Sequence, residues 1–183
     1  MKSELERRHR FEDLVGEVFD PLQRYLGRRV SVDDTADLLS ETLMTIWRRL
    51  DDIPEEKALP WCYGVARRIL ANHSRGRRRH LRLVARLESE PLPVAADPSD
   101  GFDDLDLAGA LGTLPESDQE VLRLWAWEQL EPREIALALD TTANAVSLRL
   151  TRAKKKLAAA LPRQDASTAG HKRDRHAEEK SND

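Results

Sequence analysis

The sequence has little cysteine and few aromatic residues, and it lacks the motifs that most enzymes carry. Cys62 is the only cysteine among 183 residues, so an intramolecular disulfide and a cysteine zinc cluster are both excluded. The five histidines are scattered, and no nucleophile, paired-carboxylate site or phosphate-binding glycine loop can be recognised. We therefore predict a protein that is not an enzyme, with no catalytic residue, no metal and no cofactor.

Long apolar runs are also missing. The first residues, MKSELERRHRFEDL, do not contain the apolar segment of a signal peptide. No stretch approaches the roughly 20 apolar residues that a membrane-spanning helix needs. The sequence predicts a cytoplasmic protein without membrane insertion.

Charge is abundant but unevenly distributed. Charged residues make up 34% of the chain, and the formal net charge is only -3. Residues 57–87 contain nine Lys or Arg and no acid, residues 88–122 contain ten acids and no Lys or Arg, and residues 141–164 contain six basic residues and no acid. Because charged patches rather than net charge govern the binding of polyanions, this pattern indicates two separate basic surfaces.

Apolar residues recur at helical spacing in both halves, and no segment shows a strong strand pattern. We predict an all-α protein with helical domains over residues 5–87 and 105–161. A flexible, acidic, proline-containing linker over 88–104 would join them, and a disordered tail would cover 162–183. Within the first domain we expect helices over about 5–27, 34–50 and from 60 onward. Pro21 is expected to kink or split the first helix, and Gly76 to lie near the end of the third.

Residues 131–157 have the form of a helix-turn-helix, EPREIALALDTTANAVSLRLTRAKKKL. Pro132 opens a short helix, and a turn ending at the expected N-cap Thr142 leads to a longer one. Val146 and Leu150 would hold the second helix in the domain core. Its remaining faces would contact base edges and phosphates in a DNA major groove. A helical hairpin with a solvated basic face is the alternative interpretation.

The third helix begins with two aromatic residues and ends in an arginine cluster, WCYGVARRILANHSRGRRRH. Proteins hold single-stranded nucleic acid by stacking bases on aromatic rings while guanidinium groups follow the phosphates. Trp61 and Tyr63 would provide the rings. Taken singly, the two aromatics would be ordinary core residues and the arginines a solvated tail, but their adjacency favours nucleic-acid binding.

The second helix carries an acidic stripe of Asp34, Asp37 and Glu41 at helical spacing. Acidic side chains would not contact DNA. The stripe is either a solvated helix face or a docking surface for a basic protein partner.

These segments, taken together, resemble the bacterial sigma factors of the extracytoplasmic-function class, also called group 4. Residues 36–50, ADLLSETLMTIWRRL, resemble the acidic helix of region 2, and residues 58–79 resemble the promoter-melting helix that follows it. Residues 111–157, from LGTLPESDQEVL onward, resemble region 4. The resemblance spans about residues 10–160. It implies an alternative sigma factor that binds core RNA polymerase through the β′ clamp helices and the β flap, and that directs it to promoter DNA.

The resemblance also assigns roles to individual residues. Those expected to dock on the polymerase are Asp34, Asp37, Leu38, Glu41 and Thr42. Those expected along the -10 element and its melted strand are Trp61, Tyr63, Arg67, Arg68, Asn72, Arg75, Arg77, Arg78 and Arg79. Those expected at the -35 duplex are Thr142, Asn144, Ala145, Ser147, Arg149, Arg152 and Lys154. The family further implies an anti-sigma partner.

Four positions depart from the common family pattern: Ser40, Arg68, Asn144 and Ser147. They bear on which promoter would be read rather than on the class of protein. Two alternatives stay open. One is a response-regulator-type transcription factor, which would need an α/β receiver in the first half, and the other is a helical protein-interaction module. We also consider that the acidic linker screens the basic helices in the free protein.

Overall fold

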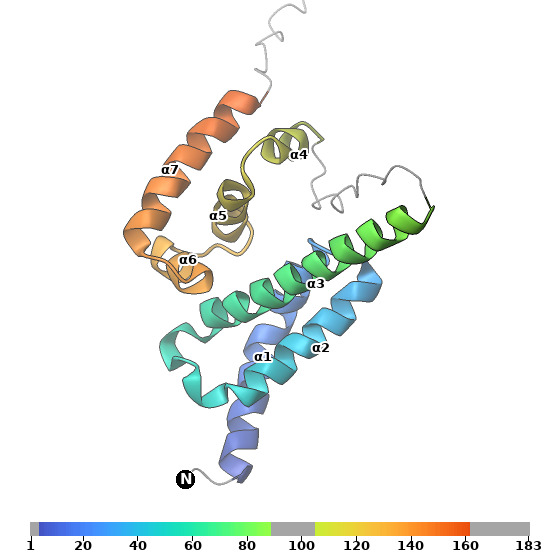
Figure 1. Cartoon of the computed structure of the whole chain (residues 1–183). Helices are drawn as coiled ribbons and strands as arrows, with labels where there is room; N and C mark the ends of the chain where they lie inside the picture. Colours follow the sequence, from blue (N-terminus) through green and yellow to red (C-terminus); the bar gives the residue numbers. More distant parts are fainter. Residues whose placement is uncertain (1–3, 89–104, 162–183) are drawn as a thin grey trace, which may run out of the picture.

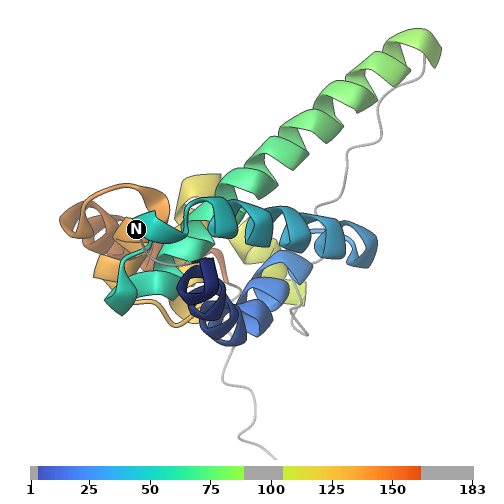
Figure 2. The same cartoon turned by 90° about the horizontal axis from the view of Figure 1, so that it is seen from below.

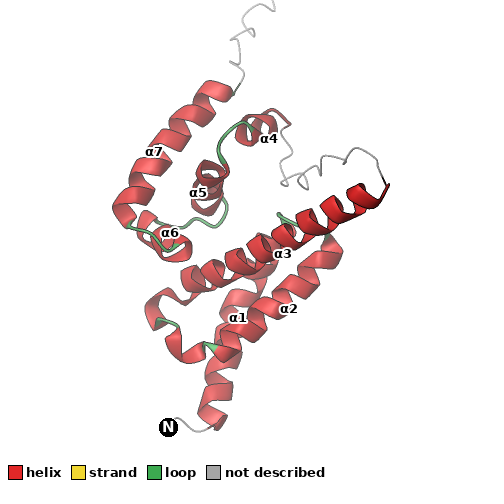
Figure 3. Cartoon of the chain, viewed as in Figure 1, coloured by secondary structure: helices red, strands yellow, loops and turns green. Residues whose placement is uncertain are grey.

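The structure, a computed structural model, describes residues 4–88 and 105–161, and these residues fold into helices without a strand (Figure 3). The helices are α1 (Glu4–Gly27), α2 (Val32–Arg48), α3 (Ala58–Glu88), α4 (Leu105–Gly112), α5 (Glu116–Ala126), α6 (Pro132–Leu139) and α7 (Ala143–Ala160). Two short 3₁₀ turns, Leu50–Asp52 and Glu55–Lys57, connect α2 to α3. The all-α prediction is confirmed. The predicted tail and, apart from Glu88, the predicted linker lie outside the described residues.

Helices α1, α2 and α3 form the N-terminal unit, in which each helix packs against the other two. The stripe predicted for α1 is largely buried, with Leu14, Val18 and Leu22 in the core. Ile46 of α2 and Cys62 of α3 are fully buried beside them. Ser31 caps α2, because its hydroxyl oxygen accepts a hydrogen bond from the Asp34 amide at 3.3 Å.

Pro21 does not split the first helix, and the third helix does not end near Gly76. Pro21 lies inside α1, which runs unbroken from Glu4 to Gly27. Helix α3 continues through Gly76 to Glu88, well beyond the expected end. A glycine costs a helix interior only about 1 kcal/mol relative to alanine, which the strong helix formers on either side can offset. The part of α3 beyond Gly76 extends away from the rest of the N-terminal unit (Figure 2).

Helices α4 to α7 form the C-terminal unit, in which α7 packs against α4, α5 and α6. Glu131 and Glu134 make a capping box at the start of α6, where Pro132 occupies the first turn as predicted. Asp140 then adopts a left-handed conformation with φ 55° that ends α6. Thr142 caps α7 by accepting a hydrogen bond from the Ala145 amide at 3.2 Å, so the predicted helix-turn-helix is confirmed.

The two units pack against each other, mainly where α6 crosses the first half of α3 (Figure 1). Their buried apolar residues form one continuous cluster. The sequence did not indicate this contact, because it depends on how two separately amphipathic units meet. Among the described residues, no helix is long and apolar enough to cross a membrane.

Candidate nucleic-acid interface and the contact between the units

Helix α7 presents its predicted DNA-contacting residues to solvent. Val146, Leu150 and Ala153 are buried against the C-terminal unit and fix the rotation of the helix. The opposite side therefore faces outward. Its exposed residues include Thr142, Asn144, Ala145, Ser147, Arg149, Arg152 and Lys154.

Three of the α7 cations already have partners within the C-terminal unit. The Nε of Arg149 lies 4.0 Å from an Asp118 carboxylate oxygen, and the same carboxylate accepts a 2.6 Å hydrogen bond from Lys156. Lys154 sits over the Trp125 ring, with its Nζ 3.3 Å from the ring centroid. Trp125 is 42% exposed, and its ring makes a cation–π contact with this lysine.

The aromatic residues at the start of α3 are less accessible than the predicted DNA-contacting residues of α7. Tyr63 is only 2% exposed, and its ring contacts Tyr25 of α1 at a centroid distance of 5.2 Å. Trp61 is half-buried, with the Arg49 guanidinium 5.1 Å from its ring centroid. In this arrangement Trp61 has a partly open ring, whereas Tyr63 belongs to the core.

The predicted -10 arginines are spread along α3. Arg67 is half-buried, and the others are exposed together with Asn72. Arg68 donates a 3.2 Å hydrogen bond to Asp140 of the C-terminal unit, and Arg75 donates one to Asn72. Arg77 lies 3.7 Å from Asp34 of α2. Arg78 and Arg79 make no ion pair or hydrogen bond with other described residues.

The predicted polymerase-docking residues of α2 separate into two groups. Asp37 and Glu41 are exposed on the outer face of the helix. Leu38 is 4% exposed and Thr42 is fully buried, so these two side chains hold α2 in the bundle and are not offered to a partner. Asp34 is half-buried beside His73 and Arg77 of α3, at 3.5 and 3.7 Å.

Gly64 marks the closest approach of the two units. A Cβ added at this position would lie 3.1 Å from the main-chain oxygen of Ala138 in α6. Glycine therefore allows the backbones of α3 and α6 to approach closely. The residue falls between Tyr63 and Arg67, in the middle of the surface expected to meet the -10 strand.

Two glutamates of the C-terminal unit bind the N-terminal unit through buried polar groups. Glu120 accepts hydrogen bonds from the Tyr25 hydroxyl at 3.0 Å and from Arg29 at 3.4 Å. Glu128, whose side chain is 3% exposed, accepts hydrogen bonds from Arg28 at 2.9 Å and from the Tyr63 hydroxyl at 3.2 Å. We call Glu120, Glu128 and these partners the inter-unit network.

The network changes the acidity of its members. Burial raises the pKa of Tyr25 and of Tyr63, and the adjacent carboxylates of Glu120 and Glu128 raise them further. For Arg29, burial alone would lower the pKa, but Glu120, Tyr25 and Glu128 outweigh it and the net pKa is raised. Both tyrosines therefore stay protonated as donors and the arginine stays charged, which keeps the network intact near neutral pH.

Sequence reasoning missed this network. No role was predicted from the sequence for Arg28, Arg29, Glu120 or Glu128. The available sequence signal was Tyr25 with Arg28 and Arg29 three and four residues later. Its partners lie about a hundred residues away in the sequence, so only the tertiary structure identifies them.

Residues 104–157 match the family model of sigma-70 region 4. The RNA polymerase sigma factor NccH of Alcaligenes xylosoxydans xylosoxydans is 27% identical over 140 residues, which cover 72% of this chain and 75% of NccH. The region 4 match contains α5, α6 and most of α7, the helices that carry the predicted -35 surface. The sequence-based assignment of the second half is therefore supported by an independent comparison.

Two solved structures share the fold. The sigma factor RpoE of Bartonella quintana, determined in complex with the anti-sigma factor NepR, superposes with a TM-score of 0.62 at 21% identity, covering 82% of this chain and 95% of RpoE. CnrH, determined in complex with the cytosolic domain of CnrY, gives 0.55 at 24% identity, covering 81% and 85%. These likenesses extend over both units and establish the architecture.

Proposed function

We propose that this protein is an alternative sigma factor of the extracytoplasmic-function class, which binds core RNA polymerase and directs it to specific promoters. The observation that carries the proposal is the region 4 match, which includes most of α7 and its exposed face. The sigma-factor fold shared by both units supports extending the proposal to the whole described chain. The protein acts by binding in the cytoplasm, without catalysing a reaction of its own.

In this proposal α7 enters the major groove at the -35 element. The outward residues at its N-terminal end, Asn144 and Ser147, reach base edges, while Arg149 and Arg152 neutralise phosphates. The cap at Thr142 leaves the first amides of α7 directed at the DNA backbone, where helix N-termini bind phosphate.

Helix α3 captures the melted -10 strand. Unstacking a base costs a few kcal/mol, and stacking on an aromatic ring returns about 1–3 kcal/mol per base. Trp61 offers such a ring at the beginning of the helix, and Arg68, Arg75 and Arg78 follow the backbone. Engagement of Tyr63 requires the C-terminal unit to move away, because Glu128 holds its hydroxyl.

Asp37 and Glu41 dock on basic groups of the polymerase, since they are the exposed members of the acidic stripe. A regulatory anti-sigma protein controls the factor, as expected from the structure of RpoE in complex with the anti-sigma factor NepR. The response-regulator alternative requires an α/β receiver, whereas residues 4–88 form a three-helix unit.

The decisive experiment is run-off transcription with core RNA polymerase on a genomic library. The wild-type chain should yield discrete transcripts. Arg149→Ala should lower yield by weakening contact with the -35 duplex, and Trp61→Ala should leave closed-complex formation intact but reduce permanganate-detected melting. The absence of any transcript that depends on the added protein would refute the proposal.

A further inference from the structure

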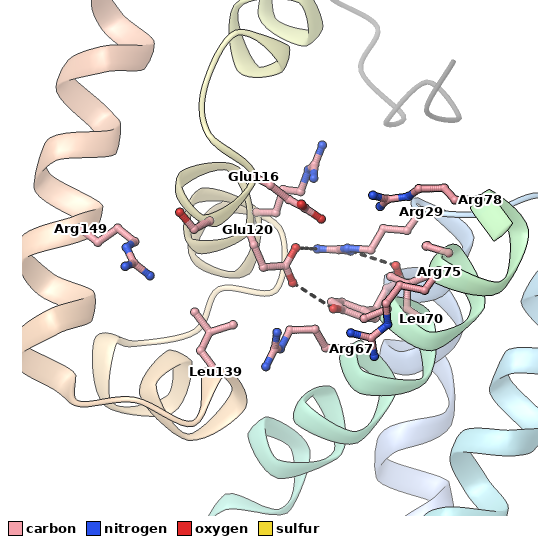
Figure 4. Close-up of a pocket in the computed structure, with 14 residues that line it drawn as sticks. Arg29, Arg67, Leu70, Arg75, Arg78, Glu116, Glu120, Leu139 and Arg149 are labelled. Atoms are coloured by element: carbon pink, nitrogen blue, oxygen red, sulfur yellow. Dashed lines mark hydrogen bonds and ion pairs between the residues drawn. The ribbon is translucent and has the colours of Figure 1, made fainter. Parts of the chain in front are cut away.

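An arginine-lined cavity of about 580 Å³ lies between the two units (Figure 4). One wall comes from α1 and α3 of the N-terminal unit, and the other from α5, α6 and α7 of the C-terminal unit. Neither unit contains the cavity by itself. Its volume falls within the roughly 300–1,000 Å³ that is typical of small-molecule sites.

The charge of the lining is strongly positive. Six arginines line it, and the only carboxylates are those of Glu116 and Glu120. The arginines are Arg29, Arg67, Arg75, Arg78, Arg123 and Arg149. In the close-up, Arg149 of α7 projects toward the cavity from the side opposite the α3 arginines (Figure 4). Packing of the units thus gathers cations from four separate segments around one space.

Several of these donors lack a protein partner. The Nε atoms of Arg29 and Arg67 are buried without a hydrogen-bond acceptor. Arg67 and Arg78 form no ion pair or hydrogen bond with other described residues. A buried donor without an acceptor is costly, and gathered like charges repel one another. A bound anion would relieve both costs.

We propose that this cavity binds an oligophosphate group and that the ligand bridges the two units. Guanidinium forks match phosphate oxygens in paired hydrogen bonds, and Arg67, Arg75, Arg78 and Arg149 can surround a phosphate chain. A single phosphate would fill only a small part of the space. Leu70 of one wall and Leu139 of the other add apolar surface against which the nucleoside of a nucleoside triphosphate can pack.

The ligand opposes opening of the units, because opening would separate the two walls. At a ligand concentration of 100 times Kd, the closed form gains about 100-fold over the open form. The regulatory consequence rests on the proposed function: the ligand holds Arg67 and Arg149 away from DNA and keeps the sigma factor inactive. The binding itself is independent of that function.

The test is isothermal titration calorimetry on the full chain in 150 mM NaCl without Mg²⁺, using sodium tripolyphosphate, ATP and adenosine in parallel. We expect one tripolyphosphate per chain and no binding of adenosine. Equal affinity for ATP would assign the site to the phosphate chain alone, and at least fivefold tighter binding of ATP would assign it to a nucleoside triphosphate. Because neither polymerase nor DNA is present, this result is separate from the test of sigma-factor activity.

Substitutions identify the site. Arg67→Gln and Arg149→Gln, from opposite walls, should each weaken tripolyphosphate binding by at least tenfold. Arg78→Gln, at an exposed position, serves as a further cavity variant whose folding is not in question. The matched control is Arg133→Gln, which makes the same charge change on α6 outside the cavity and should alter Kd by less than twofold.

A variant that keeps every arginine tests the bridging geometry. Gly64→Leu places side-chain atoms against the Ala138 backbone and should separate the walls, weakening binding at least tenfold. Any one of three results would overturn the proposal. The first is that the wild type does not bind tripolyphosphate, and the second is that Gly64→Leu binds it as tightly as the wild type although scattering shows that the units have separated. The third is that Arg133→Gln and Arg67→Gln weaken binding equally.

Discussion

Helices α3 and α7 are both long, basic and expected to face DNA, yet the structure leaves them in different situations. The side chain of Arg149 on α7 is 47% exposed, whereas Tyr63 on α3 is 2% exposed and hydrogen-bonded to the C-terminal unit. The difference does not come from the helices' own sequences. It arises because α6 packs across the first half of α3, while only the inner face of α7 is covered.

This contrast suggests an order of events. A duplex can reach the predicted -35 surface without rearrangement, but a -10 strand cannot reach Tyr63 until the units separate. Variants that open the contact between the units should therefore change DNA binding at the -10 surface more than at the -35 surface.

The largest effect is expected from Glu128→Gln. Breaking a buried ion pair by removing one charge costs about 3–5 kcal/mol. Glu128 pairs with Arg28 and Arg29 at 2.9 and 3.7 Å, and of these two only Arg29 keeps another carboxylate, that of Glu120. The closed arrangement should lose most of its population, seen as an increased radius of gyration in small-angle X-ray scattering. Glu17→Gln, at an exposed α1 position with no ion pair among the described residues, is the control. An unchanged radius would show that the inter-unit network does not hold the contact.

Gly64→Leu should open the contact by a different route. Overpacking costs about 1–3 kcal/mol, which corresponds to roughly 5- to 150-fold in the closed–open equilibrium. Binding of a single-stranded -10-type oligonucleotide should rise accordingly, while binding of a -35 duplex changes by less than twofold, as measured by fluorescence anisotropy. Gly76→Leu is the matched control, because a Cβ there has no neighbour within 4 Å. Equal gains in affinity for both oligonucleotides would show that the contact between the units does not restrict α3 more than α7.

The tyrosines predict a pH dependence. Their pKa values are raised in the folded protein, so the stabilisation is fully present below the ordinary pKa of about 10 and is lost as the pH rises above it. Each tyrosine contributes a slope of about 1.4 kcal/mol per pH unit in that range. The free energy of unfolding, measured with urea, should fall less between pH 9 and pH 11 for Tyr63→Phe than for the wild type. Equal losses of unfolding free energy in the two proteins would show that Tyr63 does not contribute to the pH dependence.

The smallest effect concerns Lys154, which the sequence assigned to DNA and the structure places over Trp125. Lys154→Gln should destabilise the protein by about 0.5–1 kcal/mol through the lost cation–π contact. If Lys154 also contacts a phosphate, the slope of log K against log salt for duplex binding should decrease by about 0.9. Lys155→Gln, at an exposed position without a ring partner, provides the comparison. Equal thermal stability in the two variants would show that the ring contact contributes nothing.

The local elements followed from the sequence because their signals are local. Apolar spacing predicted α1 and α2, Pro132 predicted the start of α6, and Thr142 predicted the cap of α7. The third helix was predicted to end too early, since one glycine is a weak signal against strong helix formers on both sides. Leu38 and Thr42 were placed at the docking surface by resemblance, although they lie on the buried side of α2.

By itself, the sequence determined which segments are helical, which face of each is apolar and where the positive charge is concentrated. These properties depend on residues three or four positions apart. The tertiary structure alone decided that Tyr63 is covered, that Glu120 and Glu128 hold the two units together, and that arginines from α3 and α7 surround one cavity. Those features join residues separated by tens to about a hundred positions, so they exist only when the two units meet.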